Sequence, residues 1–564
     1  MHVRLLGPPS IVGDDGTAMD VRGQKPWALL ARILLAERPL SRRELSTELF
    51  PETVDPLGSL RWTLASLRKA LGIADLFTGD PVSRELPLGV TVDVVSLADG
   101  VLDPDALGEL LDGINPPSGP EFEIWLLVAR QQIAARVDAI LHDHVVSALS
   151  RGDHQVALRL ADIAARRAPY DEGTQILLVK SLIASGATSA AVALVADVEA
   201  RFERELGVTA SAALRSAARR GIAFTPPGVS AHSQATALLD AGRAALAAGA
   251  VDAGLDCLRR AAAEAEGAGD DVLLAWSVFE LGTALVHSSR GFDDEGSVLL
   301  ERAVVLAEQH GERELFVNSM RERGYVDALA GRRTEAERRL ALAASAAEGN
   351  STLLAGVEAI NGLNYADWGR PAEGLEHFDR SIDLARSAGD REREAWALGI
   401  GAWAALADGR THEALQWSSS SLTIVRDLRW VSFEPWPIAV AEETRLVVGD
   451  GAQFSTLEKC FAQACQLSDP CWQGAAARLI ALHYSAAGRH DDAVRWITDA
   501  ARRARSANDT WAAMIGAIQL SEADIWAAAG DTARAQRAAR ESIAFSAHAQ
   551  LDGMLARAVS LLSH

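Results

Sequence analysis

The sequence is poor in residues that cross-link a chain or anchor it in a membrane. Only four cysteines occur among 564 residues, too few for a disulfide framework. No apolar run reaches the roughly 20 residues of a membrane-spanning helix, and no basic segment followed by an apolar one opens the chain. We therefore expect a soluble, cytoplasmic protein that does not enter a membrane.

Motifs for nucleotide binding and catalysis are also missing. The sequence has no Gly-x-x-x-x-Gly-Lys-[Ser/Thr] loop, no Gly-x-Gly-x-x-Gly between strand and helix, and neither Gly-x-Ser-x-Gly nor His-Glu-x-x-His. Cys460, Cys465 and Cys471 lack the tight spacing of zinc ligands, which favours buried apolar cysteines. The sequence predicts neither a metal site nor a cofactor, and it does not favour an enzyme.

The composition indicates a folded chain of several domains. Hydrophobic residues make up 49% and charged residues 23%, which excludes wholesale disorder. Single cores rarely exceed about 250–300 residues, so 564 residues predict several of them. The net charge is −21, of which residues 1–95 carry −1. Only this N-terminal segment is therefore a plausible nucleic-acid surface, and its low charge predicts weak binding by a single copy.

Two predicted helices near the N-terminus have clear end signals. Ser41 is a good N-cap, and Glu44 completes a capping box for a helix over 41–50. After a turn with two prolines, a second amphipathic helix is predicted over 59–71, with Gly72 as its C-cap. Its leucines form one stripe at positions 60, 64, 67 and 71.

The face opposite this leucine stripe is small and basic. It carries Trp62, Ala65, Ser66 and Lys69, flanked by Arg61 and Arg68. Arginines that hold phosphates while short side chains approach base edges suit a helix in a DNA major groove. A core helix with a solvated basic face fits this pattern equally well.

The flanking segments favour the DNA-binding interpretation. Short β-type runs over 2–6 and 10–12 and a helix over 26–37 come before the helix pair. A β-hairpin over 76–94 follows it as a predicted wing. Residues 1–96 are therefore predicted to be an α/β winged helix-turn-helix.

Together these motifs resemble the antibiotic-regulatory (SARP-type) transcriptional activators. The resemblance lies in Leu5-Leu6-Gly7, Gln24 to Leu30, Ser41 to Leu45, and Ser59 to Gly72. In that family an OmpR-like winged helix is followed by a bacterial transcriptional activator domain. Trp62 stands where a smaller or polar residue is expected, so the operator sequence cannot be carried over.

This interpretation makes promoter DNA the first expected partner. The residues predicted to contact it are Arg42, Arg43, Ser59, Arg61, Trp62, Ser66, Arg68, Lys69 and Arg84. The resemblance further implies contact with RNA polymerase and dimerisation on direct repeats, both through the activator domain.

After residue 96 the chain is predicted to be wholly helical. A TPR-like activator domain is expected over 97–222, opening with a long helix over 121–150. Within it Arg166 to Glu172 and Glu203 to Gly207 resemble the activator domain of the same family. A linker over 223–234 follows.

The remaining residues, 235–564, repeat with a period near 40. Turn glycines recur at 249, 291, 331, 369, 409, 449, 488 and 530. A helix on each side of such a turn indicates a superhelix of tetratricopeptide (TPR) type. Gly362, Tyr365, Gly374 and Phe378 show its signature, with small residues at the helix crossing and Phe378 in the core.

Tryptophans are frequent in these repeats, and most are predicted to be core. A few could line a groove for a peptide, protein or small-molecule effector, with Trp430, Phe433 and Trp436 as the best candidates because two prolines interrupt the helical pattern there. An irregular loop between repeats would explain the same stretch.

Two functions follow from this sequence. The first is a DNA-binding activator that an effector modulates through the TPR repeats. The alternative is a TPR interaction scaffold whose winged helix no longer binds DNA, an alternative that the near-neutral first domain and Trp62 suggest.

Overall fold

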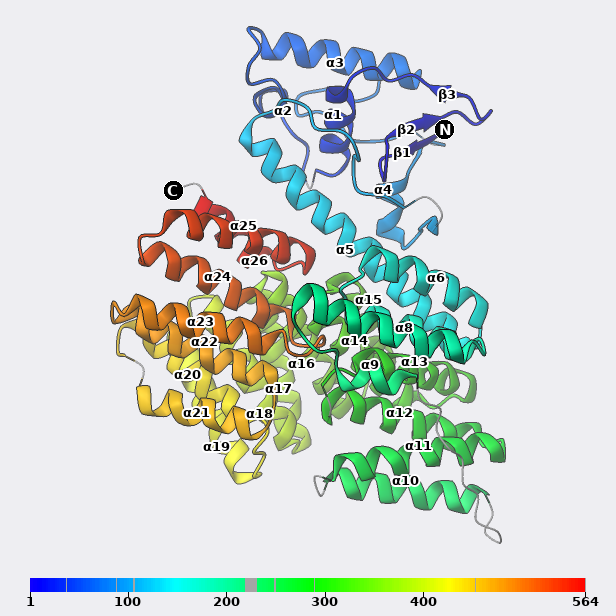
Figure 1. The fold of residues 1–564 in the computed structure, drawn as a ribbon, viewed down its shortest axis with the longest axis vertical. Helices are drawn as coiled ribbons and strands as arrows, with labels where there is room; N and C mark the ends of the chain where they lie inside the picture. Colours follow the sequence, from blue (N-terminus) through cyan, green and yellow to red (C-terminus); the bar gives the residue numbers. More distant parts are fainter. Residues whose placement is uncertain are drawn as a thin grey trace. The chain divides into compact units, whose positions relative to one another are not determined.

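The computed structural model describes all residues except 37, 88, 105–106, 219–230, 248–249, 289, 452 and 563–564. It consists of two compact units, Met1–Ile140 and Leu141–His564, called here the N-terminal and C-terminal units (Figure 1). Most of the predicted linker, and the predicted turn at Gly249, lie outside the described residues. Residues 231–234 of that linker belong to a helix.

A small sheet opens the N-terminal unit. Its strands are β1 (His2–Arg4), β2 (Ser10–Val12), β3 (Ala18–Met19) and β4 (Thr91–Val92), in the order β3-β2-β1-β4. Strand β4 is parallel to β1, and the other pairs are antiparallel. Val3 and Ile11 face each other across β1 and β2 and are both buried.

Three helices of this unit pack against one another, and the signals at their ends include the predicted capping box. They are α1 (Gln24–Leu34), α2 (Arg42–Leu49) and α3 (Pro56–Leu71), followed later by α4 (Asp93–Ser96) and η1 (Leu97–Asp99). Ser41 and Glu44 form the predicted capping box of α2. Helix α3 begins three residues earlier than predicted, because Asp55 accepts a hydrogen bond from the Gly58 N–H (2.8 Å) and Pro56 suits a first helical turn.

The predicted wing is different in the structure. Residues 76–87 form turns and irregular chain, without the two strands of a hairpin. Phe77 has a left-handed backbone (φ 55°), which interrupts a strand. The Arg68 guanidinium donates to the carbonyls of Leu76 (2.7 Å) and Phe77 (3.0 Å), so these acceptors are not free for a ladder. Among the described residues of the predicted hairpin, only Thr91–Val92 is a strand.

The long helix α5 (Pro120–Arg151) begins in the N-terminal unit. There Arg130 donates to the carbonyls of Leu110 (3.1 Å) and Leu111 (3.2 Å). The Arg32 guanidinium lies over the ring of Trp125, 5.0 Å from its centroid. These contacts fix the first part of α5 within the same unit as the winged-helix elements.

The C-terminal unit contains the last part of α5 and the short helices that follow it. These are α6 (His154–Arg167), α7 (Glu172–Ala184), α8 (Thr188–Arg201), the π-helical turn η3 (Phe202–Leu206) and α9 (Ala212–Ala217). Gly186 turns the chain between α7 and α8 with φ 86°, a conformation that suits glycine.

Eight helix pairs and a final helix complete the unit and are called here the array. Its first pairs are α10 (Ala231–Ala247) with α11 (Val251–Ala268), α12 (Asp271–Ser288) with α13 (Asp293–His310), α14 (Arg313–Leu329) with α15 (Arg333–Ala346), and α16 (Ser351–Trp368) with α17 (Pro371–Ala388). The later elements are α18 (Arg391–Ala407) with α19 (Thr411–Asp427), α20 (Pro435–Val448) with α21 (Phe454–Gln466), α22 (Pro470–Ala486) with α23 (His490–Ala504), α24 (Ala512–Ala528) with α25 (Thr532–His548), and α26 (Asp552–Leu562). The predicted TPR-type superhelix is confirmed.

The predicted packing signature is present where α16 crosses α17. Phe378 is fully buried, and a Cβ on Gly362 would lie 2.9 Å from its ring. Helices can therefore approach this closely only because position 362 carries no side chain.

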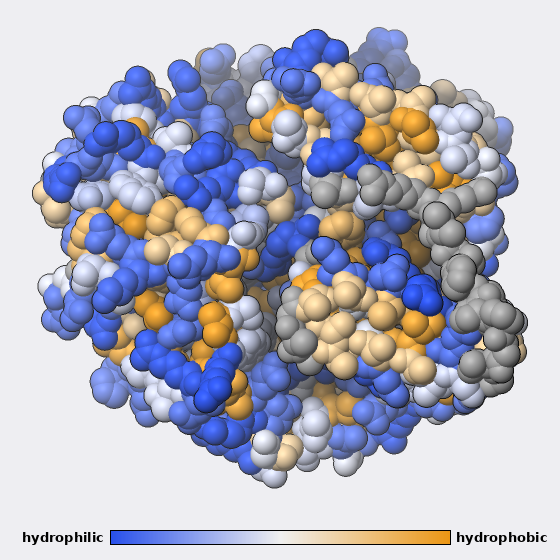
Figure 2. All heavy atoms as spheres, turned by 60° about the horizontal axis from the view of Figure 1, so that its bottom comes forward, coloured by the Kyte–Doolittle hydropathy of each residue, from blue (hydrophilic) through white to orange (hydrophobic). Residues whose placement is uncertain are grey.

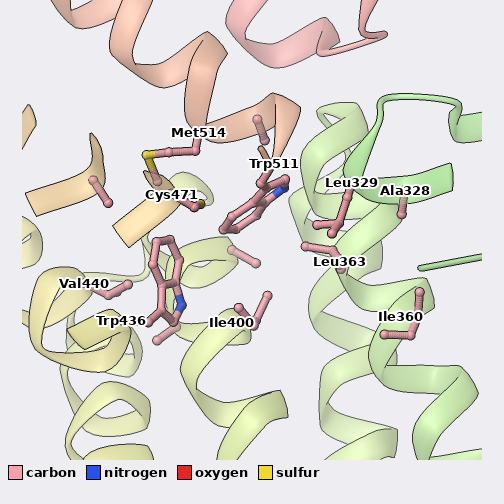
Figure 3. Packing of buried hydrophobic residues seen from close by; sticks show 14 of the residues in the cluster. Ala328, Leu329, Ile360, Leu363, Ile400, Trp436, Val440, Cys471, Trp511 and Met514 are labelled. Carbon is pink, nitrogen blue, oxygen red and sulfur yellow. The ribbon is translucent and has the colours of Figure 1, made fainter. Parts of the chain in front are cut away.

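The core of the array is continuous across distant repeats. One cluster of buried side chains extends from Val304 to Leu551. Figure 3 shows part of it, with Trp511 near Leu329 and Leu363, and Trp436 near Val440. The Trp511 indole N–H donates to Asp367 (2.6 Å), which joins the start of α24 to α16.

Candidate functional site

Helix α3 presents a basic face with little acid nearby. Its four leucines are at most 3% exposed, while Arg61, Trp62, Ala65 and Lys69 are exposed and Ser66 is half-buried. Arg61 lies 3.7 Å from the Asp55 carboxylate, its ion-pair partner. Within the described part of the chain, no ion pair engages Lys69 or the exposed Arg43 of α2. This arrangement leaves cationic groups available to a polyanion.

Three other arginines predicted to contact DNA use their guanidinium groups inside the unit. Arg42 donates to the Gly79 carbonyl (2.9 Å), and Arg84 donates to the Ala36 carbonyl. Arg68 holds Leu76 and Phe77 as described above. The predicted Ser59 is half-buried near the start of α3, and its carbonyl accepts from Thr63 (2.8 Å).

Apolar side chains are also exposed in the turn before α3 and in its first two turns. Val54, Leu57 and Trp62 are 106%, 45% and 71% exposed. A cluster of this kind is typical of a surface that contacts another molecule.

The capping box stabilises the N-terminus of α2, the helix that precedes α3. Hydrogen bonds from Arg38 and from both the hydroxyl and the backbone N–H of Ser41 lower the pKa of Glu44 to about 2. Glu44 therefore stays ionised and keeps α2 capped at neutral pH.

The array contains a cavity of about 450 Å³, which is lined mainly by the first helix of successive pairs. Successive helices supply side chains at positions i, i+3 and i+7, which lie on one helical face. Helix α14 gives Glu322, Tyr325 and Leu329, and α18 gives Arg393, Trp396 and Ile400. The other lining residues include His287, Arg290, Asp390, Glu392, Asp469, Cys471, Trp472 and Trp511.

The predicted groove residues separate in the structure. Trp430 and Phe433 line this cavity, with ring centroids 4.8 Å apart. Trp436 lies outside the lining: it is 2% exposed and its indole N–H donates to the Gly399 carbonyl (2.9 Å). Pro435 begins α20 and Pro437 lies in its first turn, so the prolines start a helix here.

Most of the ionisable groups in the cavity have partners. Glu322 accepts from Arg321 and from His287 (2.7 Å); although burial opposes ionisation, these cations hold the pKa of Glu322 well below its usual range. Asp469 accepts from Arg290 (3.0 Å) and caps α22. Burial raises the pKa of the Cys471 thiol to about 12, so this cysteine stays protonated. The sequence analysis missed these residues, because their spacing within each helix became meaningful only once the helices were stacked.

A second polar cluster joins the last part of α5 to the array. Asp143 accepts from Arg338 (3.3 Å), Arg323 (3.5 Å) and Arg339. Arg323 and Arg339 are almost fully buried. The ends of their side chains are therefore neutralised by a carboxylate that α5 supplies.

His142, next to Asp143, makes a further contact. It is hydrogen-bonded to Asp294 of α13 (2.7 Å), and burial, followed by the charge of Arg332, lowers its pKa. Nearby, Lys180 of α7 pairs with Glu295 of α13 (3.1 Å). The segment 290–295 thus connects the cavity residue Arg290 with α5 and α7.

These helices and contacts define a repeat-built protein with an N-terminal unit of a small sheet and three helices. Comparison with known families adds one domain assignment. Residues 107–220 match the family described as the bacterial transcriptional activator domain. This range lies within the predicted 97–222 and includes α5 to α9. The chain therefore carries this domain followed by TPR-type repeats, as the resemblance to the SARP-type activators implied. This domain and the repeats indicate a regulator or a scaffold.

Solved structures give only distant likenesses. Aspartyl phosphate phosphatase F from Bacillus subtilis is 10% identical, with a TM-score of 0.38 over 72% of this chain and 93% of its own. The apo quorum sensor NprR from B. thuringiensis is 12% identical, with a TM-score of 0.38 over 64% and 97%. A STAND protein with a tetratricopeptide repeat sensor from Pyrococcus horikoshii is 12% identical, with a TM-score of 0.36 over 92% and 62%. Likenesses this weak carry no conclusion about function, and no curated protein sequence matches the chain.

The surface and the helices add two observations. On the face shown in Figure 2 hydrophilic residues predominate, and hydrophobic ones are scattered between them. Among the described residues, no helix combines the length and apolarity needed to cross a membrane, and no cluster of His, Cys, Asp and Glu could hold a metal ion.

Proposed function

We propose that this chain is a sequence-specific DNA-binding transcriptional activator whose helix α3 enters the major groove of promoter DNA. The observation that carries the proposal is the outward face of α3, where Arg61, Trp62, Ala65 and Lys69 are exposed above a fully buried leucine stripe. A helix anchored in this way can read bases without disturbing its own core.

Each exposed residue has a distinct role in this proposal. Arg43, Arg61 and Lys69 bind phosphates, while Trp62 and Ser66 contact base edges. Arg42, Arg68 and Arg84, whose guanidinium groups bind carbonyls, hold the loops that frame α3. By resemblance, the activator domain contacts RNA polymerase and dimerises on direct repeats.

The array is the proposed sensory part of the protein. An effector bound there modulates the activator domain through the contacts of Asp143 and His142 with α13, α14 and α15. Helix α14 carries both the cavity residue Glu322 and the neighbouring Arg323 that binds Asp143, so one helix joins the two places.

Selection of bound duplexes from a random pool, followed by fluorescence anisotropy over a range of salt concentrations, tests DNA binding. Loss of one phosphate contact in Arg61→Ala or Lys69→Ala lowers the slope of log K against log salt by about 1. Trp62→Ala changes the preferred sequence. Arg22→Ala is the matched control, because Arg22 is exposed in the same unit and pairs with Asp20 (2.8 Å) outside α2 and α3. Salt slopes that are equal in all four proteins and in the unmodified chain would contradict the proposal.

An interaction scaffold is the second candidate, and the exposed Val54, Leu57 and Trp62 favour it. In that case α3 docks a protein through its apolar first turns, and DNA binds weakly and without sequence preference. Sequence-selective, strongly salt-dependent binding in the selection experiment rejects this candidate.

A further inference from the structure

The cavity in the array is lined by an arginine, Arg393, whose guanidinium has no direct partner among the described residues. Among the described residues, no hydrogen-bond acceptor or carboxylate pairs with the Arg393 guanidinium; only the backbone N–H of Arg393 is engaged, by Asp390 (2.9 Å). Burial, together with the nearby positive charge of Arg321, lowers the pKa of Arg393 to about 10. Arg393 is half-buried, and its guanidinium is accessible from the cavity, so an anion supplied from outside could pair with it directly.

The acids of the cavity do not fill this role. Glu322 is bound to Arg321 and His287, and Asp469 to Arg290. Asp390 caps α18, and Glu392 is exposed. The charges of Glu322, Asp390 and Glu392 favour the ionised form of Arg393, but none of these carboxylates forms an ion pair or hydrogen bond with its guanidinium. The guanidinium therefore remains open to a direct anionic partner on the ligand.

The walls next to Arg393 are aromatic. Trp396 follows one helical turn later, and its ring meets Tyr325 edge-on, with centroids 6.3 Å apart at 71°. Trp430 and Phe433 stack on each other from the loop before α20. Ile360 and Leu363 of α16 add apolar surface. Such walls suit a flat, apolar body attached to the anionic group.

We propose that this cavity binds a small aromatic carboxylic acid, with its carboxylate paired to Arg393 and its ring packed between Trp396 and Trp430. About 450 Å³ accommodates a small molecule of this class. Arg393, Trp396 and Ile400 occur at i, i+3 and i+7 of α18, so one helical face presents the charge and the apolar surface together. The inference rests on the proposed role of the array as the sensory part of the protein.

Isothermal titration of the full chain, without DNA, with 1-naphthaleneacetate and with its neutral amide tests the proposal. We expect the carboxylate to bind more tightly than the amide by roughly 10- to 100-fold, the range expected of a charge-assisted contact. Arg393→Gln removes this difference and leaves amide binding unchanged. Arg393→Lys keeps part of it.

Arg391→Gln is the matched control, because Arg391 lies two residues earlier on α18 and pairs with Asp427 (2.9 Å) outside the cavity. It is expected to bind both probes like the unmodified chain. Arg393→Gln is also expected to melt at the same temperature as the unmodified chain or higher, since no internal partner of its guanidinium is lost.

Equal affinities for acid and amide, undiminished carboxylate binding by Arg393→Gln, or no saturable carboxylate binding at millimolar concentration would each overturn the proposal. Because DNA is absent, these results are separate from DNA binding. Carboxylate binding without any effect on promoter affinity or transcription would uphold the site and contradict the sensory role proposed for the array.

Discussion

Charged side chains inside the array show at the residue scale how burial changes chemistry. Asp367 is 8% exposed and accepts from the Trp511 indole (2.6 Å) and from Arg333 (3.4 Å). Burial nevertheless raises the pKa of Asp367 to about 6, because two partners do not replace the water that a carboxylate loses. Asp367 therefore joins α16 to α24 at an energetic cost that grows when it ionises.

This cost predicts a pH-dependent effect of Asp367→Asn. Below the ordinary pKa of 3.8 the carboxyl is protonated in both states, and between 3.8 and about 6 the native state holds the proton more tightly. The contribution of Asp367 to the free energy of unfolding is thus lost as pH rises through 6. Relative to the unmodified chain, the variant gains about 2.4 kcal/mol between pH 4 and pH 7, at 1.36 kcal/mol per pKa unit.

Urea unfolding at several pH values, compared at each pH with the unmodified chain, measures this gain. Asp197→Asn is the control, because Asp197 is exposed and pairs with Arg201 on the surface. A stability difference for Asp367→Asn that does not vary with pH would refute the assignment.

At the scale of the element, the repeats depend on close crossings between paired helices. The α16–α17 pair depends on contact between the backbone at Gly362 and the ring of Phe378. A methyl group at position 362 must displace the ring or the helix, because well-packed cores accept added atoms poorly.

Gly362→Ala is therefore expected to lower the free energy of unfolding by about 1–3 kcal/mol. Gly267→Ala is the matched control in α11: it has nothing within 4 Å of the added Cβ, and it is expected to stabilise by about 0.5–1 kcal/mol through helix propensity. Thermal unfolding followed by circular dichroism distinguishes the two signs. If both substitutions stabilised the protein, the close crossing would not hold.

The elements that could be predicted from the sequence are those fixed by local patterns. The capping box of α2, the leucine stripe of α3 and the glycine period of the repeats depend on neighbours within about four residues or on a repeated unit. The prediction of a wing was wrong, although local propensity favoured a strand there. Arg68 binds the carbonyl of Phe77, and the left-handed backbone of Phe77 interrupts a strand. A contact of this type leaves no periodic trace in the sequence.

At the scale of the whole molecule, the activator helices meet the array within the C-terminal unit. Asp143 gathers three arginines of α14 and α15 from about 180 to 196 residues away in sequence. Removing it leaves Arg323 and Arg339 buried without that carboxylate, while Glu301 remains near both (3.2 and 3.3 Å).

Asp143→Ala is expected to raise amide hydrogen exchange in residues 141–151 and in α14 and α15 by roughly tenfold or more, which corresponds to a loss of about 1.4–3 kcal/mol. Asp153→Ala is the control, since Asp153 is exposed and pairs with Arg151 (3.3 Å). Mass spectrometry of the exchanged full chain measures both. Unchanged exchange in α14 and α15 would show that Asp143 does not hold the activator helices to the array.

The two candidate sites differ in how far they could be predicted from the sequence. The DNA-facing residues of α3 could be proposed from one helical period, because they lie on a single element. In the cavity, Trp430 and Phe433 were identified by composition, but Tyr325 and Arg393 belong to helices about 70 residues apart and meet only after the repeats stack. The i, i+3, i+7 spacing of the cavity residues in α14 and α18 was present in the sequence, but it did not indicate that these side chains would line a common cavity.

The sequence by itself determined that the chain after residue 96 is helical, that the helices pair with a period near 40, and where the helix with the capping box begins, since backbone capping and hydrophobic periodicity act between near neighbours. Tertiary structure alone decided which arginines remain free for a ligand or for DNA. That outcome depends on which carbonyls and carboxylates arrive from distant segments, and the energy of a charge is set by those neighbours and by its burial.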